Sequence, residues 1–419
     1  MGDDDVRRDP PAGPARRAGG RFGTTYRLLW SGTASANLAD GIVLSAGPLL
    51  AAAITRDPVL VSGLVVAQRL PWFLFTLISG ALVDRHDRRR IMVVANLMRA
   101  CALALLAAAL GAGIESLALL YAAVFALGVS ETFVDNASLA VLPAIVGRDD
   151  LDAANGRIFA TQSVMNELVG PPLGSVLFTV AIAAPFGGAA LGFTAGALLV
   201  AGMHGSLSGG RGDAHDMGSE ISDGFRWFWR HRIIRTVALM AGGLNFFSAA
   251  TLGVLVLVAQ ERLGVTDTGY GLLLAAAALG GVAGGWGAEP LTRRLGWGPA
   301  IFVSNLLPAI GHAGIALTTH AAVAALMLAF SSFAGMVGNV VVASLRQTAI
   351  PNEMLGRVTS VYRLFGLGAL PLGAAFGGFT ASAFGLVAPF WIAAGCLTVM
   401  ALVLLPILTT DAIRRARGG

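Results

Sequence analysis

The 419-residue chain is 55% hydrophobic and 13% charged, with a mean hydropathy of +0.73. Water-soluble domains carry roughly a quarter of their residues as charged side chains, so this composition excludes an ordinary soluble protein and indicates one that resides in a lipid bilayer. The net charge of +5 rests on 29 basic residues, all of them Arg. It requires no nucleic-acid partner, because Arg near a membrane is attracted to anionic lipid headgroups.

The first 25 residues are charged and rich in Pro and Gly, and they lack the apolar core of a signal peptide, so a disordered tail is expected there. A membrane-spanning helix needs roughly 20 mainly apolar residues. Apolar runs bounded by charges, Gly or Pro predict twelve spans, at residues 26–54, 58–83, 90–111, 116–145, 153–180, 183–204, 236–260, 269–291, 298–318, 320–345, 356–384 and 387–409. The expected fold class is an all-α membrane protein.

The longest internal polar segment follows the sixth predicted span and divides the chain in two. The predicted organisation is an N-terminal six-helix bundle at 26–204, a cytoplasmic linker at 205–235, a C-terminal six-helix bundle at 236–410 and a short tail at 411–419. From Phe225 to Arg235 the linker interleaves Phe and Trp with Arg, a pattern typical of a helix at the membrane interface.

The Arg residues predict the orientation of the chain. If both termini are cytoplasmic, 24 of the 29 Arg lie in cytoplasmic tails and loops, and only Arg56 and Arg262 lie on the opposite side. Cytoplasmic loops of membrane proteins carry such an excess of basic residues. Three further Arg, at positions 69, 99 and 363, fall inside predicted spans.

Two patterns recur about 200 residues apart. Asp84 is followed at i+4 and i+5 by two Arg, and Glu289 is followed by two Arg at the same spacing. The stretch Asn155–Gly174, which begins with Asn-Gly-Arg and contains Pro-Leu-Gly, has a counterpart at Leu355–Gly373. Repeats at nearly one offset predict two homologous halves.

The segment "GALVDRHDRRRIM" (Gly80–Met92) resembles the signature loop between helices 2 and 3 of the major facilitator superfamily. Together with "LDAANGRIF" and "GPPLG", it is similar to the drug:proton antiporter branch that contains enterobactin and macrolide exporters. The resemblance implies two pseudo-symmetric six-helix bundles around a central cavity, with alternating access by rocking of the halves.

The resemblance implies that the acidic residue of this loop latches the two halves in the outward-open state, against the start of helix 11. The resemblance therefore implies a conformational latch, with the residues Gly80, Asp84, Arg85, Arg88, Arg89 and Arg357. The alternative is that the segment is only a cluster of charges that sets topology.

Five charged residues in predicted spans are candidates for proton coupling and transport: Asp40, Glu131, Asp135, Glu167 and Arg69. A carboxylate near the bilayer centre costs about 2.5 to 3.5 kcal/mol on insertion scales. Partly desolvated carboxylates that gather in one cavity could exchange protons near neutral pH. Arg69 would keep its carboxylate partner ionised, and the sequence leaves open which residue that is. The alternative for each carboxylate is a buried ion pair that holds helices together.

In the fifth predicted span, "GPPLGS" resembles the Gly-Pro-x-x-Gly-Gly signature of antiporters, with Gly170, Pro171 and Gly174 in the matching positions. That match implies export. The last Gly of the pattern is Ser175 here, and span 4 lacks the Arg that antiporters of the family often carry there.

No nucleophile-and-base set and no metal-ligand spacing is apparent, so neither an enzyme nor a cofactor is expected. Cys101, Cys396 and His312 are interpreted as packing residues.

The predicted function is a proton-coupled antiporter for efflux of an amphipathic small molecule such as a drug, siderophore or other metabolite. The alternatives are an importer or lipid flippase of the same fold, or a non-transporting receptor or scaffold. Partners are the substrate, protons and the bilayer, with no nucleic acid; a monomer is favoured and the oligomeric state is left open. The bias toward Ala, Gly and Arg suggests a bacterial plasma membrane.

Overall fold

The computed structural model describes residues 22–204, 225–411 and 413, and the long regular elements within these ranges are helices. The N-terminal helices are α1 (Thr24–Ile54), α2 (Pro58–Arg85), α3 (Arg88–Gly111), α4 (Leu117–Ile145), α5 (Leu151–Gln162), η2 (Ser163–Val169), α6 (Gly170–Val180) and α7 (Ala184–Ala201). The C-terminal helices are α9 (Arg232–Leu257), η3 (Val258–Arg262), α10 (Asp267–Leu295), α11 (Trp297–Leu317), α12 (Ala321–Ala349), α13 (Asn352–Phe384) and α14 (Ala388–Leu404). Ten helical segments of the described chain are long and apolar enough to cross a membrane.

Local sequence explains where the helices begin and end. Asp57 accepts a hydrogen bond from the Val59 amide and precedes Pro58, the first residue of α2, and Ser116 caps α4 through the Leu119 amide. Such side chains satisfy amides that have no partner within the helix. Gly296 follows the last residue of α10 and adopts φ +84°. Glycine reaches this conformation without steric cost.

The fifth predicted span is helical but not uniform. Between α5 and α6, residues Ser163–Val169 form a π-helix. Pro171 and Pro172 follow after Gly170. Neither has an amide hydrogen for the carbonyls of Glu167 and Leu168, so the ladder of hydrogen bonds changes register here. The π-helix turns the polar side chains of this segment in a direction that a regular helix would not give them.

The predicted interfacial helix is shorter than expected. Residues 225–230 are helical, the helix breaks at His231, and α9 begins at Arg232. The Nδ1 atom of His231 accepts a hydrogen bond from the Ile234 amide, which requires neutral imidazole, and burial lowers the pKa of His231 accordingly. Arg232 to Arg235 therefore belong to the following helix and not to the linker.

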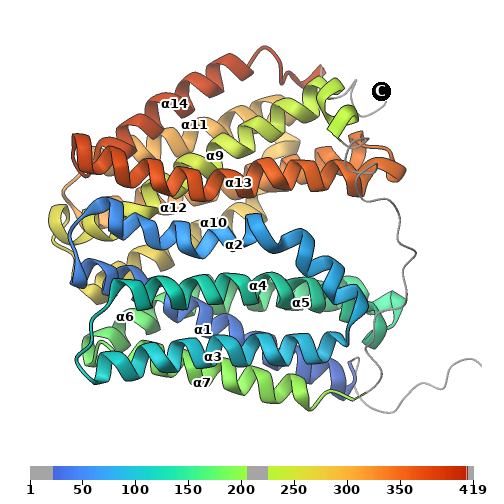
Figure 1. The fold of residues 1–419 in the computed structure, drawn as a ribbon. Coiled ribbons are helices and arrows are strands. Elements are labelled where there is room, and N and C mark those ends of the chain that lie inside the picture. The colour runs from blue at the N-terminus through green and yellow to red at the C-terminus, as the bar shows by residue number, and fades with distance from the viewer. Residues whose placement is uncertain (1–21, 205–224, 412, 414–419) are drawn as a thin grey trace, which may run out of the picture.

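The helices lie side by side in two groups, with α1–α7 below and α9–α14 above in Figure 1. Within the first group α1 packs on α6 and α7, and α4 packs on α2 and α3; within the second, α9 packs on α13 and α12 on α10 and α11. The groups meet where α2 contacts α13 and α9, and where α6 contacts α10.

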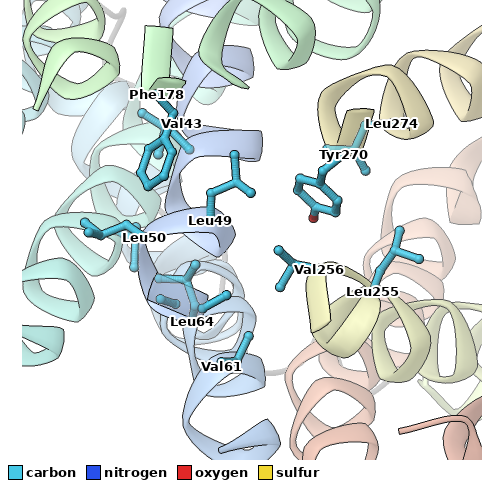
Figure 2. Packing of buried hydrophobic residues seen from close by; sticks show 14 of the residues in the cluster. Val43, Leu49, Leu50, Val61, Leu64, Phe178, Leu255, Val256, Tyr270 and Leu274 are labelled. Carbon is cyan, nitrogen blue, oxygen red and sulfur yellow. The ribbon is translucent and has the colours of Figure 1, made fainter. Parts of the chain in front are cut away.

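One end of the molecule is closed by a core shared between the two groups. Where α1 joins α2 and α9 joins α10, a single cluster of buried side chains contains Leu49 and Val61 together with Val256 and Tyr270, and Figure 2 shows these residues facing each other across the interface. At the opposite end the buried clusters are separate: one holds residues of α1–α7 only, and two hold residues from 228 onward only. The halves are therefore joined at one end and packed independently at the other.

Candidate functional site

A cavity of about 300 Å³ lies among α1, α2, α3, α4 and the α5–η2 segment, and Met336 of α12 contributes to its wall. Its lining includes six charged side chains: Asp40, Glu131, Asp135, Glu167, Arg69 and Arg99. All five residues predicted to take part in transport thus line one cavity, and Arg99 joins them. We call it the acidic cavity, because four carboxyl groups share it with two guanidinium groups.

Arg99 forms the ion pair of this cavity. Its Nη1 atom lies 3.2 Å from Oδ2 of Asp40, and the two side chains are 2% and 18% exposed. The guanidinium also lies over the ring of Phe193, 5.1 Å from its centroid. The Nε and Nη2 atoms of Arg99 are buried without a hydrogen-bond partner among the described residues. The sequence left open whether Asp40 or another carboxylate pairs with Arg69. In the structure, the partner of Asp40 is Arg99.

The other three carboxylates of the acidic cavity differ from Asp40 in their contacts with described residues. Within the part of the chain that the structure describes, no salt bridge involves Glu131, Asp135 or Glu167. Glu131 accepts a hydrogen bond of 3.2 Å from Nε1 of Trp72, a partner that sequence reasoning missed. These three carboxylates therefore lack the direct guanidinium contact that Asp40 makes.

A second cavity of about 490 Å³ lies mainly among α9–α14. Most of its wall is apolar, and its polar groups include Asn245, Thr251 and His312; we call it the apolar cavity. Arg69, Glu167 and Met336 line both cavities. Arg69 and Glu167 therefore stand at the border between a charged compartment and a hydrophobic one.

The Gly-Pro-Pro segment lies at the contact between α6 and α1. A Cβ atom at Gly170 would come within 2.5 Å of the Cα atom of Gly41, and one at Gly174 within 2.6 Å of Oγ of Ser45. The Ser45 hydroxyl donates to the carbonyl of Pro171 at 2.8 Å. The small residues thus permit close packing of the two helices behind the wall of the acidic cavity.

The loop between α2 and α3 is held by its own side chains. Asp87 caps α3 by accepting from the amides of Arg89 and Arg90. Arg88 Nη1 donates to the Ala140 carbonyl at 3.0 Å, and Arg89 Nη1 donates to the Met203 carbonyl at 2.7 Å. These two Arg tie the loop to the end of α4 and to the chain just after α7. Asp directly before a helix start is a common capping signal, and it could have identified Asp87.

The remaining latch residues are placed as follows. Among the described atoms, none lies within 4 Å of a Cβ added at Gly80. Arg85 is exposed, and Arg357 is half-buried on α13. The side chain of Asp84 lies outside the described residues.

Comparisons with known proteins find a secretion effector family, an efflux pump, an exporter and transporters. A family model described as transmembrane secretion effector matches residues 22–414. The chain is 28% identical over 388 residues to the multidrug efflux pump Tap of Mycolicibacterium fortuitum, covering 87% of this chain and 90% of that protein. It is 25% identical to the enterobactin exporter EntS of Citrobacter koseri, over 69% of each chain. Among solved structures, the nucleoside transporter NupG aligns with TM-score 0.75 at 10% identity over 92% of this chain and 99% of that one. A bacterial homologue of the iron transporter ferroportin, in an inward-facing state, aligns with TM-score 0.68 at 18% identity over 91% and 98%.

Proposed function

Because this chain belongs to the transmembrane secretion effector family of major facilitator superfamily transporters, we propose that it is a proton-coupled exporter of an amphipathic small molecule. The names of two relatives, a multidrug efflux pump and an enterobactin exporter, support outward transport of a drug, a siderophore or another metabolite. The proposed location is a bacterial plasma membrane with both termini cytoplasmic, which the distribution of Arg supports.

The observation that carries the proposal is the junction of the two cavities. Beside the Asp40–Arg99 pair, the acidic cavity offers three carboxylates that form no salt bridge with a described residue, and the adjoining apolar cavity offers a hydrophobic surface. A substrate with one polar and one apolar part fits such a pair of compartments. Carboxylates with no cation partner can take up a proton in one state and release it in another, which is what coupling to a proton gradient requires.

The proposed transport cycle rests on the two groups of helices acting as six-helix bundles, at 26–204 and 236–410. The core shared by both groups at one end, and the separate cores at the other, support a rocking motion in which one end opens while the other closes. With cytoplasmic termini, the end closed by Leu49 and Tyr270 is the extracellular one.

Replacing Glu131 with Gln is expected to reduce energised export to near background. Gln keeps an oxygen that can accept the hydrogen bond of Trp72 but cannot bind and release a proton, so the packing is preserved while coupling is lost. The measurement is export of a panel of dyes and drugs from efflux-deficient bacteria, with and without a protonophore. Wild-type export is expected to stop on uncoupling.

Glu115→Gln is the matched control, because Glu115 is exposed in the loop before α4 and lines neither cavity. It should export like wild type. Asp40→Asn is scored per folded molecule, since it also removes the ion-pair partner of Arg99. Export by Glu131→Gln that equals wild type and keeps its pH dependence would remove Glu131 from the mechanism.

For the latch, we propose that Asp84, from its place in the family signature, holds the two halves in one state with Arg357 as its candidate partner. Asp84→Asn is then expected to lower the export rate several-fold at normal expression. Asp87→Asn serves as the control three residues away, because Asn can also cap α3. The measurement is the initial rate of export per molecule of folded protein, and equal slowing in both variants would reduce the segment to a structural loop.

A further inference from the structure

His312 is a buried titratable residue with no role in the mechanism above. It lies on α11, is 8% exposed and lines the apolar cavity. Its Nδ1 atom lies 2.5 Å from the carbonyl oxygen of Pro308, and its Nε2 atom lies 3.1 Å from Oγ1 of Thr251 on α9. Both ring nitrogens are therefore engaged, one by backbone of the same helix and one by a hydroxyl of another helix.

These contacts determine where the hydrogens are. A carbonyl oxygen can only accept, so Nδ1 carries a hydrogen and donates it to Pro308. Nε2 is then either a lone-pair acceptor, in neutral imidazole, or a donor, in imidazolium. The geometry on the Pro308 side is the same in both cases.

The Thr251 hydroxyl can serve either form of the ring. Its Oγ1 atom also lies 3.0 Å from the carbonyl oxygen of Phe247 and 3.1 Å from that of Ser248. With neutral imidazole, the hydroxyl donates its hydrogen to Nε2. With imidazolium, Nε2 donates to Oγ1, and the hydroxyl hydrogen turns to the Phe247 or Ser248 carbonyl. Rotation of one hydrogen satisfies every polar atom in both protonation states, and no heavy atom has to move.

The surroundings leave His312 electrostatically isolated. Near it, α9, α10, α12 and α14 contribute Thr251, Ser331, Phe390 and aliphatic side chains to the cavity wall, and none of the described lining residues on those four helices is ionisable. The other titratable groups of the lining are Arg69, Glu167 and Tyr362. Arg69 and Glu167 lie at the border with the acidic cavity, and the Tyr362 ring faces the guanidinium of Arg346. Among the described residues no carboxylate forms an ion pair with His312, so the Pro308 carbonyl and the Thr251 hydroxyl are the groups that stabilise a proton on its ring.

We propose that His312 is a second proton-binding residue of the transport cycle, in the C-terminal half, and that the Thr251 hydroxyl is the switch that adapts to its protonation. A proton delivered through solvent in the cavity binds the Nε2 lone pair, and the Thr251 hydrogen turns from Nε2 to a backbone carbonyl. Release reverses both movements. The proposal deepens the proposed proton coupling, since it adds a proton site that the carboxylates of the N-terminal half do not include.

The test is a direct titration that needs no transport. Wild-type protein labelled with 13C in its six His is followed by NMR between pH 5 and 8, and the His312 signal is assigned by its absence in His312→Asn, with His312→Gln as a second reference if the first fails to fold. The signal is expected to titrate in this range. Thr251→Val, which removes the hydroxyl, should move the midpoint to lower pH by about 0.5 to 1 unit, because the hydrogen bond from the charged ring is the stronger one. Thr251→Ser, which keeps the hydroxyl, should leave the midpoint unchanged.

The titration can contradict the proposal about His312 and Thr251 in two ways. A His312 signal that stays in the neutral form from pH 5 to 8 overturns the proposal and leaves His312 as a packing residue. A titration that Thr251→Val does not shift overturns the switch. Neither result touches the proton coupling proposed through Glu131, which is tested by export and by the protonophore. If His312 does titrate and Thr251→Val alone shifts it, the pH profile of export should shift in the same variant.

Discussion

Asp40→Asn is expected to destabilise the protein by about 3 kcal/mol, the low end of the cost of breaking a buried ion pair. Arg99 is 2% exposed and cannot lose its charge, so its guanidinium would remain buried without the one carboxylate that contacts it among the described residues. The partly exposed Asp40, by contrast, lies on the cavity and can be solvated or protonated. The check is thermal unfolding of purified protein in detergent, where Tm should fall by several degrees.

A double-mutant cycle separates the pair from its surroundings. Arg99→Met keeps a long apolar side chain against Phe193 but loses the cation–π contact, which is worth about 1 kcal/mol. The substitution also leaves Asp40 near Glu131 and Asp135, the two carboxylates of α4, without its cation. Lowering the pH should recover part of this loss, because protonated Asp40 no longer repels its neighbours. The Asp40→Asn, Arg99→Met double variant should be more stable than Asp40→Asn alone. Costs that simply add would mean that the pair is not coupled.

The helices were largely predictable from the sequence because residues close to their ends mark where they begin and stop. The prediction of 58–83 compares with Pro58–Arg85 for α2, and 116–145 with Leu117–Ile145 for α4; in both cases a capping residue and the end of an apolar run coincide. The prediction is less accurate for the last span, whose apolar run continues beyond the helix although Pro406 follows the helix end. The last span was drawn to residue 409, whereas α14 ends at Leu404.

The site was predictable as a set of residues but not as a set of contacts. Charged groups in apolar helices stand out because of their insertion cost, and this identifies Asp40, Glu131 and Arg99 from sequence alone. The pairing of Asp40 with Arg99 depends on how α1 and α3 are rotated toward each other, across 59 residues of chain. The position of Glu167 depends on a π-helix, which no periodicity in the sequence reveals. Long-range packing, and not local propensity, decides such contacts.

Gly378→Val is expected to shift the protein away from the state described here. Gly378 on α13 faces α2, where a Cβ atom would overlap the Ser62 hydroxyl and come within 2.8 Å of the Pro58 carbonyl oxygen. Overpacking of this kind costs about 1 to 3 kcal/mol, which corresponds to a population shift of about 5- to 150-fold if only the closed state bears the cost. The end that carries the α1–α2 connection should therefore spend more time open.

The measurement is the rate at which a membrane-impermeant thiol reagent labels Leu49→Cys in intact cells. Leu49 is 1% exposed in the core that closes this end of the molecule, and Figure 2 shows it directed toward the C-terminal helices. The background carries Cys101→Ser and Cys396→Ser, because both native cysteines are free and exposed. Labelling should accelerate at least several-fold in Gly378→Val, and Ser62→Gly should reverse part of the change by removing the side chain that the new methyl groups meet.

Gly395→Val is the matched control, since Gly395 also lies within a helix of the C-terminal half but has no described neighbour within 4 Å of an added Cβ. Its labelling rate should equal that of the unmodified background, which separates the effect of helix contact from the effect of β-branching on helix propensity. Equal acceleration in both variants would show that the α2–α13 contact does not control this end. Acceleration in Gly378→Val alone would identify the contact between α2 and α13 as a point where the two halves separate.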